Sequence, residues 1–114
     1  MRDAGDRAAA AGQWGRALRH WDAALAAGAA DAHLLHESKA QVLLEVGEDW
    51  RALQCAARAV ELRPAWATGH LTLARAQLNL GEPELALASM EHVLQLQPRH
   101  PEAGQEIGAI RTLR

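Results

Sequence analysis

The sequence has no phenylalanine and no tyrosine, and its aromatic content is limited to four tryptophans. Alanine dominates a hydrophobic content of 49%. Because sheets favour β-branched and aromatic residues whereas alanine favours helices, this composition indicates an all-α fold. The single cysteine, Cys55, excludes an internal disulfide and suits a reducing compartment.

Excess charge and long apolar runs are lacking as well. The formal net charge is −2, so the chain has no basic surplus with which to bind nucleic acid. No run approaches the roughly 20 apolar residues that span a bilayer, and the first residues do not have the pattern of a signal peptide. We therefore expect a cytoplasmic or nuclear protein with no nucleic-acid or membrane partner. The sequence leaves open whether Met1 is a natural start.

What the chain does contain is an internal repeat. Gly12, Gly47 and Gly81 lie at intervals of 35 and 34 residues, and alanines at 17, 52 and 86 follow in the same register. A period near 34 with small residues at fixed offsets indicates stacked helix-turn-helix units. Such units bury their apolar faces against one another and leave a continuous surface for partners.

Each of these glycines ends a helical pattern, because glycine tolerates the left-handed backbone that closes a helix. Pro64 and Pro98 stop the second helix of their repeats, whereas the first repeat has Ala29 instead and one extra residue in the turn. The predicted helices are 1–11, 14–27, 32–46, 49–62, 65–80, 83–96 and 101–114. We expect one domain over 1–114, a right-handed α-solenoid of three repeats (about 1–31, 32–66 and 67–100) with a capping helix at 101–114.

The register also predicts how side chains pack. The core positions are Leu18, Leu25, Leu53, Val60, Leu87 and Leu94. Small residues recur where two helices cross closely, at Gly5, Ala40, Ala74 and Gly108. Trp14 and Trp21 take core positions of the repeat. Trp50 and Trp66 sit near turns, where they either anchor a partner or, as we expect, join consecutive repeats.

Candidates for chemistry are few. The one pair with a spacing typical of metal ligands is His33 and His36, with Glu37 beside them. Catalytic zinc usually needs three protein ligands. Because His70 lies at the position equivalent to His36 one repeat later, a packing role explains both histidines. No signature pairs Cys55 with a base, and no phosphate loop or Gly-x-Ser-x-Gly elbow occurs. We therefore expect no enzyme activity, no cofactor and no metal. A metal- or redox-active module would have to depend on these histidines and Cys55.

In this register the chain resembles the tetratricopeptide repeat family. That family's pattern has a Leu-Gly pair, a glycine before the second helix, two alanines and a closing proline. The third copy matches at Leu73, Ala74, Gly81, Ala86, Val93 and Pro98, the second at Ala40, Gly47, Ala52, Ala59 and Pro64, and the first at Gly5, Gly12, Trp14, Ala17, Trp21 and Ala24. The chain departs from the pattern at Ala29, His36, Lys39 and His70. Segments 21–25, 39–43, 75–78 and 111–113 resemble one small animal member in particular.

A competing reading is the RNA-binding pentatricopeptide repeat, which has a similar two-helix unit. It favours a 35-residue period and a basic groove. The 34-residue interval, the prolines after the second helices and the slightly acidic charge favour the tetratricopeptide repeat instead.

The resemblance implies a non-enzymatic adaptor that binds a protein or peptide in its concave groove, with no small-molecule substrate. Carried onto this register, the groove residues are Asp6, Ala9, Glu37, Gln41, Leu44, Glu45, Leu71, Arg75, Leu78 and Asn79. Chaperone-binding members hold a C-terminal carboxylate with a lysine, asparagine and arginine cluster. Matching positions here are Arg2, Asp6, Gln41, Leu71 and Arg75, of which Asp6 would repel a carboxylate and Leu71 lacks the charge of a lysine. Because Asp6, Glu37 and Glu45 outnumber Arg75 in the groove and flank its leucines, we expect a partner segment with basic and apolar residues. The alternative is a structural subunit that binds through its convex face.

Overall fold

Seven helices follow one another in the computed structural model, which describes residues 2–113. They are α1 (Arg2–Ala10), α2 (Trp14–Ala26), α3 (Ala32–Glu45), α4 (Asp49–Leu62), α5 (Ala67–Asn79), α6 (Pro83–Leu96) and α7 (Pro101–Leu113). No strand occurs among the described residues, so the predicted all-α fold is confirmed. Met1 and Arg114, which end the predicted first and last helices, lie outside the described residues. None of the described helices is long and apolar enough to cross a membrane.

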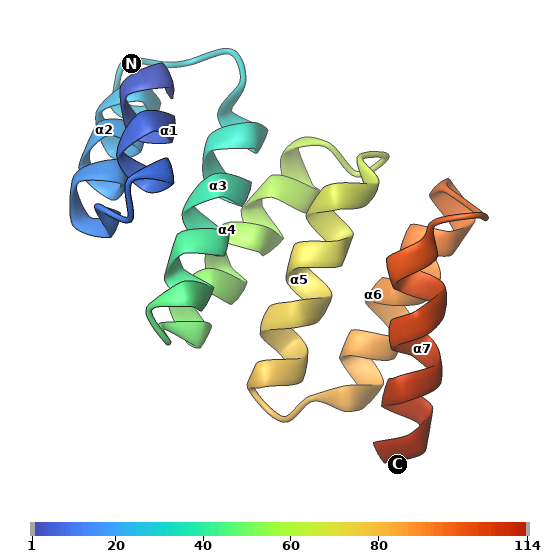
Figure 1. Ribbon diagram of the computed structural model, residues 1–114. Helices are drawn as coiled ribbons and strands as arrows, with labels where there is room; N and C mark the ends of the chain where they lie inside the picture. Colours follow the sequence, from blue (N-terminus) through green and yellow to red (C-terminus); the bar gives the residue numbers. More distant parts are fainter. Residues whose placement is uncertain (1, 114) are drawn as a thin grey trace.

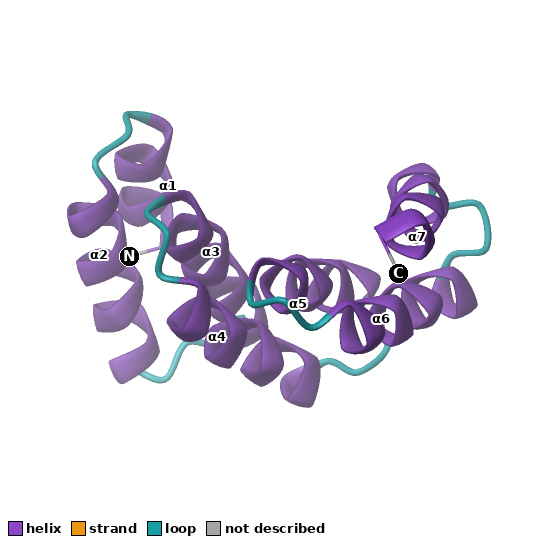
Figure 2. Ribbon diagram, turned by 90° about the horizontal axis from the view of Figure 1, so that it is seen from below, coloured by secondary structure: helices purple, strands orange, loops and turns teal. Residues whose placement is uncertain are grey.

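The helices stack as antiparallel pairs in chain order, from α1 at one end to α7 at the other (Figure 1). The stack measures 40 × 26 × 20 Å and curves into an arc. Figure 2 shows α1, α3, α5 and α7 on the inner side of this arc and α2, α4 and α6 on the outer side. The first helix of every repeat therefore faces the concave surface.

The turn inside each repeat is closed by a glycine, as the sequence predicts. Gly12, Gly47 and Gly81 have φ angles of 73°, 80° and 77°. In the second repeat the Gly47 N–H donates to the Leu44 carbonyl at 3.2 Å, and the Glu48 N–H donates to the Leu43 carbonyl at 2.8 Å. These two bonds satisfy carbonyls that the end of α3 would otherwise leave free, and they need a left-handed residue between them.

The turns between repeats are of two kinds. Arg63 and Gln97 have φ angles of −141° and −137°, because the proline that follows each one excludes the helical conformation. The end of α2 differs from the prediction: Gly28 has a φ of 78°, and the Ala29 N–H donates to the Ala24 carbonyl at 3.2 Å. Where the proline is missing, the chain uses the glycine closure found inside the repeats.

The predicted small residues allow close crossings in three of four cases. Ala40 and Ala74 are fully buried, and a Cβ on Gly5 would lie 2.4 Å from the Trp21 indole. The expectation for Gly108 is wrong, because it is exposed and no atom lies within 4 Å of a Cβ built on it. A crossing partner would have to come from a helix after α7, and the described residues contain none.

The predicted core leucines pack as expected, although most are only half-buried. Leu87 is buried, while Leu18, Leu25, Leu53 and Leu94 pack half-buried against the core clusters. At the C-terminal end, Ala103, Ile107 and Ile110 of α7 join the buried residues of α5 and α6 in one cluster. This packing shields the apolar face of the third repeat, the role expected of a cap.

Candidate functional site

A groove opens on the inner side of the arc, between the first helices of the repeats. Its cavity has a volume of about 740 Å³. Seven of the residues expected at this surface line it: Asp6, Ala9, Gln41, Leu44, Glu45, Arg75 and Asn79. They come from α1, α3 and α5, and because these helices occupy equivalent places in successive repeats, the residues face the same side of the stack.

Glu37, Leu71 and Leu78 were expected in the groove, but none of them lies on its wall. Glu37 is 5% exposed, and its carboxylate accepts hydrogen bonds from Gln41 and, at 2.9 Å, from the Thr72 hydroxyl. It therefore joins α3 to α5. Leu71 is buried in the C-terminal core cluster and Leu78 packs against it, because α6 and α7 offer apolar surface on which these side chains are removed from water.

Sequence reasoning missed four residues of the groove wall, which are Trp14, Trp21, Ser38 and Val42. Trp21 was expected in the core and is 2% exposed, yet its indole also forms part of the wall. Its Nε1–H donates to Asp6 Oδ1 at 3.0 Å. A glycine at position 5, where the next two repeats have alanine, is the signal that a large ring packs there.

The acidic N-terminal end of the groove is tied into a small network. Asp6 lies 3.6 Å from Arg2 Nε, and Arg2 Nη1 donates to Asp31 Oδ2 at 2.5 Å. This hydrogen bond raises the pKa of Arg2 and lowers the pKa of Asp31. Two carboxylates thus engage Arg2, the arginine at the first position of the carboxylate-holding set.

Arg75, the one cation on the groove wall among the described residues, is also engaged. Arg75 pairs with Glu102 and, at 3.7 Å, with Glu106, both on α7. Glu45 on the same wall is exposed and has no ion-pair partner among the described residues. An incoming segment therefore meets an open carboxylate, whereas both arginines already have carboxylate partners.

The remaining candidate residues do not assemble a reactive site. His33 packs edge-to-face on Trp66, with ring centroids 5.1 Å apart. Burial lowers the pKa of His36 and raises that of the Cys55 thiol, which disfavours the nucleophilic thiolate. Within residues 2–113, no three His, Cys, Asp or Glu side chains come together as metal ligands would.

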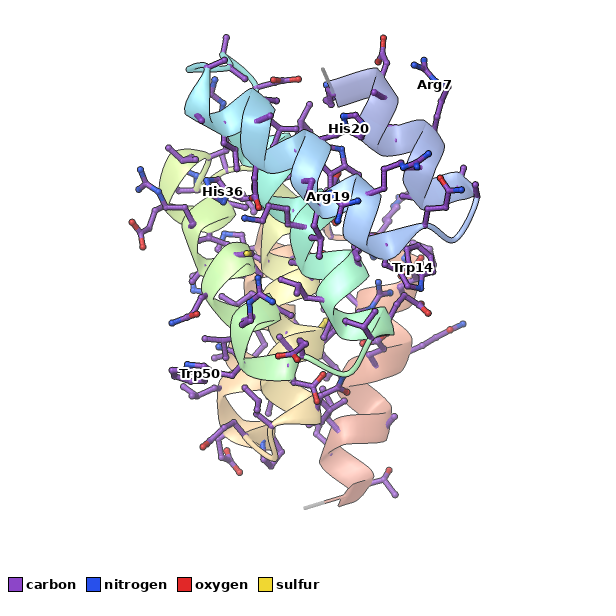
Figure 3. The ribbon with its side chains drawn as sticks, turned by 90° about the vertical axis from the view of Figure 1, so that its left-hand side faces the viewer. Arg7, Trp14, Arg19, His20, His36 and Trp50 are labelled. Carbon is purple, nitrogen blue, oxygen red and sulfur yellow. The ribbon has the colours of Figure 1, made fainter. Side chains whose placement is uncertain are left out.

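The two tryptophans near turns behave differently. Trp66 joins α5 to His33 of α3, which confirms the expected link between consecutive repeats. For Trp50 this expectation is wrong, because its side chain is 61% exposed. Figure 3 shows Trp50 at the outer edge of the molecule, on the opposite side of the view from Trp14 at the groove.

Comparison with known proteins places this architecture among the tetratricopeptide repeats. No family model matches the chain. Mouse tetratricopeptide repeat protein 33 is 38% identical over 106 residues, which cover 93% of this chain and 40% of that protein. The chain thus spans about two fifths of the length of the curated relatives that it matches first.

Solved structures share the fold, and two of them illustrate the likeness. One is the first tetratricopeptide repeat domain of Spaghetti (RPAP3) bound to the HSP90 peptide SRMEEVD, with a TM-score of 0.93, 20% identity and coverage of 98% of this chain and 88% of that one. The other is the second such domain of human RPAP3 in complex with the HSP70 peptide SGPTIEEVD, with a TM-score of 0.89, 25% identity and coverage of 96% and 90%.

Proposed function

Because the chain is an array of tetratricopeptide repeats, we propose that it is a non-enzymatic adaptor that binds a segment of a partner protein in its groove. The observation that carries this proposal is the cavity of about 740 Å³ on the inner side of the arc, whose wall mixes apolar side chains with a similar number of polar and charged ones. Ligand-binding sites of proteins are typically concave surfaces of this kind of size. Peptide binding by the two RPAP3 domains supports the same use of the fold.

The groove favours a partner segment with lysine or arginine beside apolar residues. Leu44, Val42 and Trp14 offer apolar contacts, and Glu45 offers a carboxylate with no ion-pair partner among the described residues. Buried apolar anchors supply most of the affinity of such interfaces, while charges at the rim steer the encounter and set specificity. An amphipathic helix or an extended strand would satisfy both features.

The same geometry disfavours the acidic peptides bound by the RPAP3 domains, both of which end in EEVD. Arg2 and Arg75 would each have to leave carboxylates of this chain to hold another one. Asp6 would repel an incoming carboxylate, and Leu71 is buried where a lysine would be needed. We infer that the groove does not act as a clamp for a C-terminal carboxylate.

Fluorescence anisotropy with two labelled peptides tests the proposal. One peptide alternates lysine with leucine, and the other is SRMEEVD. We expect the lysine peptide to bind more tightly and Leu44→Ala to weaken it about tenfold. Leu96→Ala removes a leucine that is exposed away from the groove, and this control should bind as the wild type does. Tight binding of SRMEEVD that is indifferent to Leu44 would contradict the proposal.

Location and other partners remain predictions from the sequence. The proposal places the protein in the cytoplasm or nucleus and gives it no nucleic-acid, membrane or small-molecule partner. Imaging of a fluorescent fusion would test the first part, and a gel-shift assay with RNA would test the exclusion of nucleic acid.

A further inference from the structure

Exposed apolar side chains gather at one edge of the arc, away from the groove wall. Four of the five large hydrophobic residues that are exposed in the described chain lie at the α3–α4 and α5–α6 turns or in the first turn of the helix that follows: Val46, Trp50, Leu80 and Leu85. Figure 1 shows both turns along the lower edge of the stack. We call these four residues the edge patch.

A hydrogen bond between the repeats brings the two turns together. The Asn79 side-chain amide donates to Asp49 Oδ1 at 3.2 Å. Leu80 directly follows Asn79, and Trp50 directly follows Asp49. The two halves of the edge patch are therefore neighbours in space, and Val46 and Leu80 occupy equivalent positions of the repeat.

The fold does not account for this exposure. Trp50 is 61% exposed and Leu85 is 53% exposed, so neither gains much from burial, and tryptophan is not a strong helix former. The contrast with Trp66, which packs on His33, shows that a tryptophan near a turn can be covered in this architecture. Apolar patches rimmed by polar groups mark interaction sites, and tryptophan is enriched at their energetic centres.

The charge around the edge patch identifies the kind of partner. Segments 46–51 and 80–85, which lie outside the groove wall, contain one arginine, Arg51, and four carboxylates: Glu48, Asp49, Glu82 and Glu84. Some of these favour the starts of α4 and α6 through the helix dipole, but their sum is a negative rim. An anionic lipid surface would be repelled. A second copy meeting the same patch symmetrically would also bring like charges together.

We propose that the edge patch binds a cationic amphipathic helix of a partner protein. The apolar stripe of that helix packs on Trp50 and its neighbours, and its lysine or arginine residues face the carboxylate rim. This surface is distinct from the groove and does not depend on what the groove binds. It would allow the array to hold two partner segments at once.

The test uses the whole chain and a labelled peptide about five helical turns long, with leucines at helical spacing and lysines on both flanks. A second peptide with glutamate for lysine controls for charge. Fluorescence anisotropy is carried out in the Leu44→Ala chain, because the groove is proposed to bind a segment of similar chemistry, and it should show binding of the lysine peptide alone. Trp50→Ser should weaken it about tenfold, and Leu96→Ser, which changes an exposed leucine outside the edge patch, should not.

Several outcomes would overturn the proposal. Loss of binding in Leu44→Ala but not in Trp50→Ser would place the peptide in the groove and leave the proposed function intact. Equal binding of the glutamate peptide would show that the carboxylate rim does not select a cationic partner. A wild-type dimer in sedimentation velocity that becomes monomeric in Trp50→Ser would make a second copy the occupant. Unchanged thermal melts should accompany Trp50→Ser, because the side chain is exposed.

Discussion

The junction between the first and second repeats and the junction between the second and third are built differently at equivalent positions. In the second junction Pro64 ends α4, and its carbonyl lies 2.8 Å from His70 Nε2. In the first, Gly28 ends α2 in a left-handed turn, and Nδ1 of His36, the equivalent histidine, is buried with no hydrogen-bond partner among residues 2–113. Helix α4 also packs on α5 more extensively than α2 packs on α3.

The difference shows what one missing proline changes. Proline fixes the chain direction through its own φ and through the residue before it. Without it, the first junction closes through glycine, as the turns inside the repeats do. Since the groove wall includes residues of all three repeats, both junctions set its shape.

Replacing an alanine with leucine should give the largest difference in stability between the two junctions. Ala52 is fully buried in one cluster with Leu43 of α3 and Ala76 of α5, so Ala52→Leu should lower the free energy of unfolding by about 1–3 kcal/mol. Ala30→Leu changes an exposed residue of the first junction and should stay within about 0.5 kcal/mol. Urea denaturation measures both, and equal costs would mean that the first junction is as tightly packed as the second.

The left-handed turn at Gly28 allows a second comparison, between this glycine and one inside a helix. Gly28→Ala places a Cβ on a residue with a φ of 78° and should cost about 1–2 kcal/mol. Gly104→Ala is the matched control, because Gly104 lies within α7 with open space around it. That change should instead stabilise by about 0.5–1 kcal/mol. A neutral Gly28→Ala in thermal melts would show that the first junction relaxes to another conformation.

His36 predicts a smaller, pH-dependent effect. Burial lowers the pKa of His36, with further lowering from Lys39 and Arg58. The folded state therefore resists a proton that the unfolded chain takes up, and stability should fall as the pH drops from about 7 to about 5. His36→Phe removes that group, so its urea midpoint should change less over this range. Parallel pH profiles for the two proteins would contradict the assignment.

The sequence predicted the fold well because its signals are local and repeated. Glycines at the same offset close α1, α3 and α5, and the prolines mark the ends of α4 and α6. Gly28 escaped notice because the register assigned a proline to that turn, and Gly108 was misplaced because its crossing partner does not exist among the described residues.

The groove was predicted less completely. Helical spacing placed Gln41 and Arg75 on the inner face, but spacing does not show which neighbour covers a side chain. Glu37 turns into the contact with Thr72 on α5, and Leu71 is covered by the C-terminal cluster. The pairing of Arg75 with Glu102 likewise depends on where α7 docks.

Mapping of a bound peptide by NMR tests the central claim most directly. Amide chemical shifts of the ¹⁵N-labelled chain would be followed while the peptide that alternates lysine with leucine is added. The account predicts the largest shifts at Ala9, Gln41, Leu44 and Asn79, on the inner side of the arc. Shifts confined to α2, α4 and α6, with the inner helices unchanged, would contradict binding in the groove.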